Sequence, residues 1–486
     1  MRREIVQRNG ASKVKSRKVA VIGCGHVGLV NAAGLAELGH KVIGLDIQDE
    51  LVEELSQGTV RFLEPGLKDL VHSNLANGRL RFTTSYSEAL SNAQIVMLCV
   101  NTPSTVTGAA DLSRVRNSAM MIGRELALAG RRPIIVNKST SPIGTGETIY
   151  AILARSLPHF LGPPRIAANP EFLREGHAVE DFFQPERIVV GADSTATAEE
   201  VKNLYSSIDA PVVVTDIRAA ELIKYASNAF LATRVSFVNE LARLCEHLGI
   251  EVDSVIRGTT LDSRIGPAFF KPGIGYGGSC LPKDVAALCH MGDSFGVPMR
   301  VLTAVQDANI AQRRHAVSCL RSALGSLEGR TVAVWGLAFK GESEDFRESP
   351  ATDVILLLRN EGAHVRLFDP ALSEDDSQQR GIAEVFSDPI EAARDADALA
   401  LLTDWQEFAR IDMVAVGEAM AGTFVYDGRN ILQRDLVEAA GLAYEGVGRP
   451  GSRMLAFSPA VFARGEHDAE PAQATTPTPQ LQPVTA

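Results

Sequence analysis

The stretch Lys18-Val19-Ala20-Val21-Ile22-Gly23-Cys24-Gly25-His26-Val27-Gly28 decides the fold of this chain. It begins with an apolar, β-branched run that is typical of a buried strand, and it continues through three glycines into a helical pattern of apolar residues. A second apolar run, residues 41–45, ends at Asp46. Strand, glycine turn, helix and strand in this order predict a parallel βαβ unit.

The three glycines have the spacing of a dinucleotide-binding loop. In such a loop the first glycine, Gly23, allows a tight turn, Gly25 lets the pyrophosphate approach the backbone, and Gly28 lets the helix pack closely. Asp46 follows Gly28 by 18 residues, where an acid accepts hydrogen bonds from the adenosine ribose and repels a 2′-phosphate. We therefore predict an NAD site that includes these residues and Val27, in preference to a glycine turn with only a structural role.

Polar residues follow two further apolar strands, 95–100 and 133–136. The first strand is followed by Asn101-Thr102-Pro103-Ser104 and the second by Asn137-Lys138-Ser139-Thr140. Ligands of open α/β sheets bind at the carboxyl ends of the strands, so we expect both segments to line the cofactor cleft, with Thr102 in the cofactor site. The alternative is that these side chains cap the helices that follow. It stays open for Ser104 and Ser139, whereas a functional role is favoured for Thr140.

A second informative stretch is Phe270-Lys271-Pro272-Gly273-Ile274-Gly275-Tyr276-Gly277-Gly278-Ser279-Cys280-Leu281-Pro282-Lys283-Asp284. Pro282 suits the first turn of a helix, which places Cys280 at the helix N-terminus. Unpaired backbone N–H groups there favour an anion, so we expect a lowered thiol pKa and a nucleophilic thiolate. The alternative is a buried free cysteine in a glycine turn.

Length and composition describe a multidomain globular chain. The 486 residues exceed one ordinary core, and 45% of them are hydrophobic. The net charge of −11 argues against general nucleic-acid binding. Because we find no apolar run of membrane-spanning length and no signal peptide, we expect a cytoplasmic protein without a membrane partner. The six cysteines have no regular spacing, so we expect reduced thiols and no structural metal.

The order of the patterns predicts an α/β chain with two Rossmann-like doubly wound domains joined by a central layer of long helices. We expect a flexible basic arm at 1–17, an NAD-binding domain at 18–214 and a central helical region at 215–327 that carries the cysteine and a dimer surface. A second βαβ domain at 328–464 lacks the glycine motif, and a disordered tail follows at 465–486. Glu171 and Glu175 are placed on one face of a helical turn, and Lys224 and Asn228 on one face of a helix. For the two glutamates the alternative is ordinary solvated charge, and for Lys224 and Asn228 it is that both side chains face solvent.

Three motifs resemble those of the nucleotide-sugar 6-dehydrogenases, most closely the UDP-glucose 6-dehydrogenases. They are Asn169-Pro170-Glu171-Phe172-Leu173-Arg174-Glu175-Gly176, Gly277-Gly278-Ser279-Cys280-Leu281-Pro282-Lys283-Asp284, and Ala338-Phe339-Lys340 with Arg347-Glu348-Ser349-Pro350. The resemblance covers residues 18–449. It implies an NAD domain and a UDP-sugar domain joined by a long helix, with assembly into a homodimer or a higher homo-oligomer.

The resemblance also implies a reaction. Two NAD⁺ oxidise the C6 alcohol of the sugar to a carboxylate, through a thiohemiacetal and a thioester on Cys280. Lys224 and Asn228 would support the oxyanion, and Thr140, Glu171 and Asp284 would hold and activate water. Glu175 and Arg347 match positions near the cofactor. The positions implied for the UDP-sugar are Phe172, Leu173, Lys224, Arg264 of a neighbouring subunit, Phe270, Gly277, Phe339, Lys340 and Arg429.

Some residues leave the substrate open. Leu281 and the Lys271-Pro272-Gly273 segment are more similar to the GDP-mannose 6-dehydrogenases, whereas Asp262-Ser263-Arg264-Ile265-Gly266 is similar to the UDP-glucose enzymes. A two-electron hydroxyacid dehydrogenase would share the first domain but would not need the cysteine loop. A catalytically silent sensor of NAD or UDP-sugar is the non-enzyme alternative, and the presence of Cys280, Lys224 and Asn228 argues against it.

Overall fold

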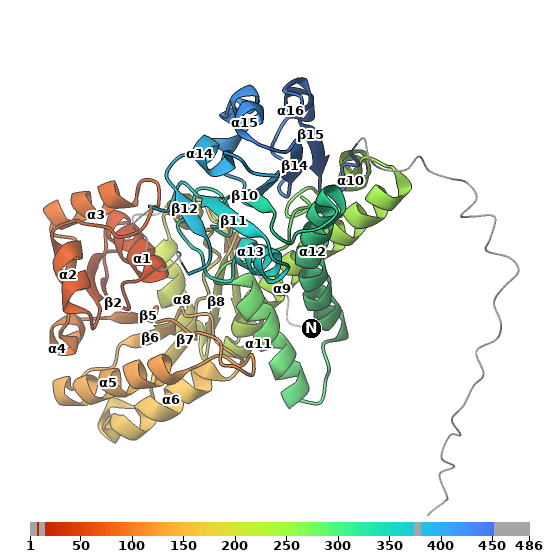
Figure 1. Ribbon diagram of the computed structural model, residues 1–486. Helices are drawn as coiled ribbons and strands as arrows, with labels where there is room; N and C mark the ends of the chain where they lie inside the picture. The colour runs from red at the N-terminus through yellow and green to blue at the C-terminus, as the bar shows by residue number, and fades with distance from the viewer. Residues whose placement is uncertain (1–6, 9–14, 374–380, 452–486) are drawn as a thin grey trace, which may run out of the picture.

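In a computed structural model the chain forms two twisted sheets with a layer of long helices between them (Figure 1). The structure describes residues 7–8, 15–373 and 381–451. The predicted tail at 465–486 and most of the predicted arm at 1–17 lie outside these residues. Two sheets of mainly parallel strands with helices on their faces confirm the predicted fold class.

The first sheet has the strand order β1-β9-β8-β7-β6-β5-β2-β3-β4. The β7–β8 and β1–β9 pairs are antiparallel, and the other pairs are parallel. Its strands are β1 (Gln7–Arg8), β2 (Lys18–Ile22), β3 (Lys41–Leu45), β4 (Leu80–Thr83), β5 (Ile95–Leu98), β6 (Ile134–Asn137), β7 (Arg165–Ala168), β8 (Ile188–Ala192) and β9 (Pro211–Thr215). Its helices are α1 (His26–Glu37), α2 (Asp49–Ser56), α3 (Leu67–Ala76), α4 (Tyr86–Leu90), α5 (Ser113–Ala129), α6 (Thr145–Ser156), α7 (Ala178–Phe183) and α8 (Thr195–Lys202).

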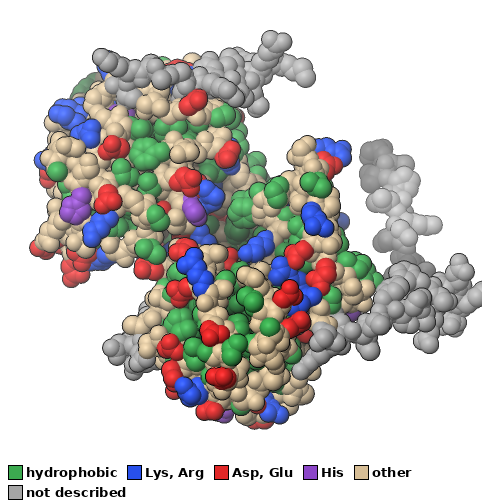
Figure 2. All heavy atoms as spheres, turned by 90° about the horizontal axis from the view of Figure 1, so that it is seen from above, with side chains coloured by type: hydrophobic (Ala, Val, Ile, Leu, Met, Phe, Trp, Pro, Cys, Tyr) green, Lys and Arg blue, Asp and Glu red, His purple; other side chains and the backbone are tan. Residues whose placement is uncertain are grey.

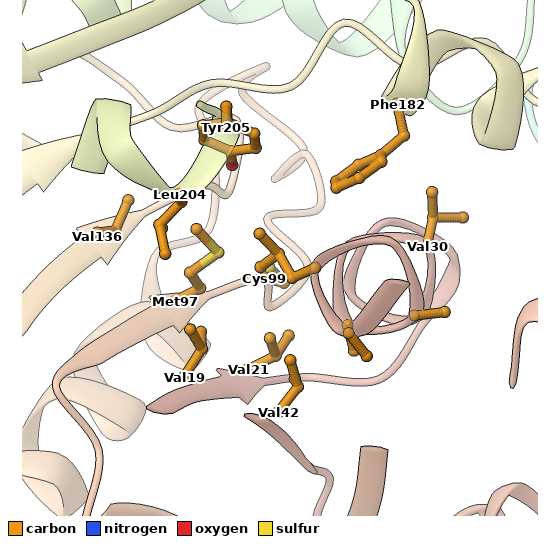
Figure 3. Close-up of a cluster of buried hydrophobic side chains, with 14 of the residues drawn as sticks. Val19, Val21, Val30, Val42, Met97, Cys99, Val136, Phe182, Leu204 and Tyr205 are labelled. Carbon is orange, nitrogen blue, oxygen red and sulfur yellow. The ribbon is translucent and has the colours of Figure 1, made fainter. Parts of the chain in front are cut away.

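Both faces of this first sheet are buried, which explains why its strands are continuously apolar. Val19 and Val21 of β2 point into a core shared with α1 and α7, while Ala20 and Ile22 point into a core shared with α5 and α6. In Figure 3, Val21 and Val42 lie on one side of Cys99, and Phe182 and Tyr205 lie on the other. This packing fixes the carboxyl ends of β2, β5 and β6 side by side.

The first strand departs from the predicted flexible arm. Gln7 pairs with Val212 and Arg8 with Pro211, so two residues of the arm add an antiparallel strand beside β9. Without β1, β9 would be an edge strand with unpaired backbone groups, and such an edge accepts another extended segment.

The central layer consists of α9 (Ile217–Leu248), α10 (Val252–Thr260), α11 (Leu281–Ser294) and α12 (Arg300–Leu324). Asp216 caps α9 by accepting from the Ala219 N–H, and Gly249 ends it in the left-handed conformation. At 32 residues, α9 is about 48 Å long, so it reaches from the first sheet to the second unit. In Figure 1, α9, α11 and α12 lie between the first sheet and the C-terminal elements.

The second sheet has the order β12-β11-β10-β13-β14-β15, and all its pairs are parallel. Its strands are β10 (Thr331–Trp335), β11 (His364–Phe368), β12 (Glu384–Phe386), β13 (Ala398–Leu401), β14 (Phe424–Asp427) and β15 (Ala443–Gly446). Its helices are α13 (Pro350–Asn360), α14 (Pro389–Ala393), α15 (Met413–Ala419) and α16 (Arg434–Ala439). Trp335 at the end of β10 is fully buried against Phe408 in one of its two cores.

Candidate active site

The loop between β2 and α1 has the geometry of a dinucleotide loop. Gly23 has φ +93°, a conformation that glycine adopts without strain. A Cβ on Gly28 would lie 1.8 Å from the Gly23 carbonyl oxygen, whereas a Cβ on Gly25 would meet no atom within 4 Å. The first and third glycines therefore serve the turn and the helix packing, and the second leaves open space. These residues fit a pyrophosphate at the N-terminus of α1.

A cavity of about 650 Å³ opens beside this loop, and we call it the cofactor cavity. The structure brings to it most of the residues predicted for the cofactor, together with Thr140. Those that line it are Gly25, Val27, Thr102, Thr140, Glu175 and Arg347. Asp46 lies at the end of β3, where its Oδ2 accepts the Cys24 N–H at 2.8 Å, and it is not one of the lining residues.

A second cavity of about 670 Å³, the substrate cavity, reaches to the second unit, which is the unit built on the sheet of β10 to β15. Figure 2 shows the surface of the molecule hollowed between two lobes. The lining of the substrate cavity includes the predicted residues Glu171, Phe172, Leu173, Glu175, Lys224, Asn228, Gly277, Cys280, Phe339 and Lys340. Cys280 lines both cavities, so its thiol lies where they meet.

Lys224 and Glu171 form a buried ion pair beside the cysteine. The Lys224 Nζ is 3.0 Å from Glu171 Oε1, and both side chains are almost fully buried. Burial alone would raise the pKa of Glu171, but Lys224 and the hydrogen bond from the Leu173 N–H outweigh it and hold this pKa below its usual value. Burial alone would lower the pKa of Lys224, and the carboxylates and the Cys280 thiol raise it instead. The pair is therefore charged at neutral pH.

Asn228, one turn after Lys224 on α9, faces Asp284 on α11. The Asn228 Nδ2 donates to Asp284 Oδ2 at 2.6 Å, and the Lys283 Nζ donates to Asp284 Oδ1 at 2.5 Å. Asp284 is buried and contacts neighbours through both oxygens. The solvent-facing alternative for Lys224 and Asn228 is wrong, because both side chains are buried in the described structure.

The expected lowering of the Cys280 pKa is wrong in direction. Cys280 is the N-cap residue of α11 and is open to solvent through the cavities. Even so, removal of water by the surrounding protein raises its pKa, Glu171 and Asp284 raise it further, and Lys224 offsets only part of the shift. The helix start is present as predicted, but the burial of the thiol and the approach of Glu171, 109 residues earlier in the sequence, follow only from the fold.

The two carboxylates after β7 do not share a helical turn, which corrects a second expectation. Residues 169–174 are irregular, because Glu171 Oε2 accepts the Leu173 N–H at 2.6 Å and folds the chain locally. Glu171 therefore turns to Lys224, whereas Glu175 turns to Ser279 and Ser343. The Glu171 carboxylate lies against α9, and the Glu175 carboxylate joins the cysteine loop to the second unit.

Three predicted substrate residues do not line the substrate cavity. Arg264 pairs with Asp262 at 2.6 Å and its side chain is 87% exposed. Phe270 is buried against Phe237. Arg429 donates to the carbonyl oxygens of Leu402 and Phe339, so it holds the loop that carries Phe339.

Several lining residues were missed by the sequence reasoning. The Arg187 guanidinium stacks on the Phe172 ring at 3.7 Å and donates to Ser227 Oγ. Phe269, with φ +56°, is among the residues that line the substrate cavity. Lys138, by contrast, belongs to a segment that was predicted to line the cofactor cleft; it is buried between both cavities, and burial lowers its pKa to about 8. Its position directly after β6 was the available signal, whereas a single arginine before β8 gives none.

Known proteins share this arrangement over nearly the whole described chain. Residues 17–209 match the NAD binding domain of the UDP-glucose/GDP-mannose dehydrogenase family, 218–311 its central domain and 333–434 its UDP binding domain. UDP-glucose 6-dehydrogenase TuaD of Bacillus subtilis (strain 168) is 42% identical over 90% of this chain and 94% of its own length. The chain belongs to the UDP-glucose/GDP-mannose dehydrogenase family.

Further members of the UDP-glucose/GDP-mannose dehydrogenase family are similar in sequence and in structure. UDP-glucose 6-dehydrogenase of Rhizobium meliloti (strain 1021) is 40% identical over 89% of this chain and 100% of its own length. A UDP-glucose dehydrogenase from Pyrobaculum islandicum superimposes with a TM-score of 0.83 at 38% identity, covering 90% of this chain and 98% of that one. The family membership and NAD as the cofactor are thereby confirmed. No helix in the described ranges combines the length and the hydropathy of a membrane span.

Proposed function

We propose that this chain oxidises the C6 alcohol of UDP-glucose to UDP-glucuronate with two NAD⁺. The observation that carries the proposal is the position of Cys280 at the junction of the cofactor cavity and the substrate cavity. A thiol at that junction can hold the C6 carbon while the hydride acceptor is exchanged. The similarity to curated UDP-glucose 6-dehydrogenases supports the choice of sugar nucleotide.

The first chemical role of this chain is to trap the aldehyde. Bound NAD⁺ would accept the hydride in both oxidations. The Cys280 Sγ adds to the C6 aldehyde and forms a thiohemiacetal, whose oxygen lies in the field of the charged Lys224 ammonium. Since the Cys280 pKa is raised, the thiol gives up its proton during the addition, and the Glu171 carboxylate beside Lys224 can pass that proton to the new thiohemiacetal oxygen and so become ionised again.

The second role is to release the product. Oxidation of the thiohemiacetal leaves a thioester on Cys280, and water cleaves its C–S bond to give the carboxylate and the free thiol. Glu171 stays ionised at neutral pH, so it can remove a proton from that water. Asp284 is held by Asn228 and Lys283, which supports a role for it in ordering water or the Asn228 amide.

The test is the NADH yield per molecule of sugar nucleotide, across a panel of sugars. Two NADH per UDP-glucose supports the proposal, one NADH indicates an alcohol dehydrogenase, and none on any sugar indicates a sensor. GDP-mannose is the alternative substrate, because Leu281 and Pro272 favour it. We expect at least about a hundredfold preference for UDP-glucose in kcat/KM, since a pocket built for uracil excludes the larger guanine.

We also propose that the chain acts as a homodimer or higher homo-oligomer through α9. Phe230, Phe237 and Leu244 recur every seven residues on this helix and are 62%, 50% and 54% exposed. These apolar side chains on α9 are therefore not covered by the residues that the structure describes, and such a patch marks an interface. Arg264 would then reach the site of a neighbouring subunit. Light scattering of the wild type and of Phe237→Glu tests the assembly.

The domain bounds predicted from the sequence support the same assignment of roles. Residues 18–214 would hold NAD, 215–327 would supply the cysteine and the dimer surface, and 328–464 would hold the UDP-sugar. The six free thiols agree with a reducing, cytoplasmic location. Cell fractionation with an antibody to the chain tests the location.

A further inference from the structure

Glu64 is a buried carboxylate that the proposed reaction does not use. It lies between α2 and α3, and its side chain is 0% exposed. It has three polar contacts: the His26 ring Nε2 at 2.9 Å, the Gly176 N–H at 2.9 Å and the Ala178 N–H at 2.8 Å. Three donors on one buried carboxylate form a rigid junction, since each charged hydrogen bond there is costly to break.

One side of this junction is the dinucleotide loop. His26 stands between the second and third glycines of that loop and is the first residue of α1. Its ring lies 4.9 Å from the Phe62 ring, and both residues line the cofactor cavity. A bound dinucleotide would therefore meet His26 directly.

The other side of the junction is the segment that reaches Cys280. Gly176 and Ala178 follow Glu175, whose Oε1 lies 3.4 Å from the Ser279 Oγ, next to Cys280. The Ser343 Oγ donates to Glu175 Oε2 at 3.3 Å, and the Lys340 Nζ donates to the Glu175 carbonyl oxygen. Glu64 thus holds this segment on the side of the first unit, while Ser343 and Lys340 hold it on the side of the second unit.

We propose that Glu64 is a positioning residue that ties the dinucleotide loop, through His26, to the segment that places Glu175 beside Cys280. Because the same carboxylate holds both segments, a displacement of one is transmitted to the other. Loss of the tie lets both segments relax, and displacements of about 1 Å near reacting atoms cost up to about a hundredfold in rate. The inference rests on the proposed function for its kinetic part and on cofactor binding for the rest.

The experiment compares Glu64→Gln with Glu221→Gln. Glu221 is a matched control, because it is also a buried carboxylate that accepts two backbone N–H groups, from Gly144 and Gly146 at 2.8 Å each, and it lines neither cavity. We expect Glu64→Gln to raise the Kd for NADH, measured by fluorescence, by about tenfold and to lower kcat by tenfold or more. Glu221→Gln should lower the Tm and leave the NADH Kd within about twofold.

A second pair of variants separates the hydrogen bond from the fold. His26→Gln keeps an N–H donor for Glu64, whereas His26→Phe keeps an aromatic ring against Phe62 but has no donor. We expect His26→Gln, which keeps the donor, to change the NADH Kd and the rate of Cys280 alkylation by iodoacetamide less than His26→Phe does. His26→Phe should raise the NADH Kd, as Glu64→Gln does, and should change the rate of Cys280 alkylation.

The proposal is overturned if Glu64→Gln lowers only the Tm, as Glu221→Gln does, with unchanged NADH Kd and kcat. If Glu64→Gln does not fold, equal NADH Kd and alkylation rates for the two His26 variants overturn it as well. A wild type that forms no NADH from UDP-glucose would refute the proposed function, while the NADH Kd of the variants would still decide the role of Glu64.

Discussion

The two Rossmann-like units begin in the same way. Strands β2 and β10 are each followed directly by a glycine with a positive φ, +93° at Gly23 and +99° at Gly336. In each, that glycine N–H donates at 2.7 Å to the carbonyl of the last residue of the next strand, Leu45 or Phe368. An acid follows that residue in both units, Asp46 in the first and Asp369 in the second.

The units differ in what the acid binds. Asp46 is partly exposed and accepts the Cys24 N–H from the loop. Asp369 is fully buried, where it accepts the Leu337 and Ala338 N–H groups and the Trp405 Nε1–H, and burial raises its pKa. Since Trp405 and the loop after β10 surround Asp369, this acid is not open to a ligand, and a ligand of the second unit would be held by other side chains. The same arrangement of strand, glycine and acid therefore does not give equal binding sites, because the side chains around the acid differ.

The largest expected effect is at the point where the two units meet. Cys280→Ser should reduce net turnover by about a thousandfold or more, because the thiohemiacetal cannot form. NADH formation from UDP-glucose measures the loss. Cys289→Ser, on the same helix α11, is the control and should retain activity. Normal turnover of Cys280→Ser would show that neither cavity depends on this thiol.

Glu171→Gln should slow the last step more than the first ones. The thioester needs an activated water after both hydrides have left, so steady turnover should fall by about a hundredfold while a burst of NADH remains. Intact mass spectrometry should detect a sugar adduct on Cys280. A slow variant without an adduct would transfer the role to Asp284, Lys224 or Glu175.

Asp46→Asn and Asp369→Asn test the comparison of the acids directly. We expect Asp46→Asn to lose about tenfold in kcat/KM for NAD⁺ and to discriminate less against NADP⁺, because the ribose contact and the repulsion of a 2′-phosphate are both weakened. Asp369→Asn should leave the ratio of NAD⁺ to NADP⁺ use unchanged and lower the free energy of unfolding by about 1–3 kcal/mol. Equal use of NADP⁺ by the wild type would place Asp46 away from the ribose.

The smallest expected effect is at Arg187. Arg187→Lys keeps the charge but loses the stacked contact with Phe172, which is worth about 0.5–2 kcal/mol. The KM for UDP-glucose should rise a few-fold with little change in kcat. Arg165→Lys, at a surface pair with Glu200 and outside both cavities, should leave KM unchanged. Equal KM values would limit Arg187 to a structural role.

The sequence predicted the elements better than their contacts. Apolar runs and glycine positions placed β2, β3, β5 and β6 to within a residue or two, because local patterns determine these elements. The short strands β4, β12 and β15 were missed, since they mix polar with apolar residues and contain no continuous apolar run.

Contacts between distant segments explain the remaining differences. The sequence could not show that Glu171 turns to Lys224 while Glu175 turns to Ser279, because the backbone of residues 169–174 is set by a side-chain hydrogen bond. For the same reason the sign of the Cys280 pKa shift was missed, since it depends on burial of the thiol and on Glu171, which the fold brings near. Which residues line the cavities beyond the motifs, such as Arg187, follows only from the packing.

Trp405, which donates to the buried Asp369, also gives the second unit an intrinsic fluorescent probe. The sequence has two tryptophans, Trp335 and Trp405, and both lie in the second unit. Their indole groups donate to the Pro389 carbonyl oxygen and to Asp369. The unit that carries the dinucleotide loop has no indole, so its unfolding is silent in tryptophan emission. Tryptophan emission from the intact chain therefore reports the unfolding of the second unit alone, whereas circular dichroism of the peptide bonds reports the unfolding of both units together.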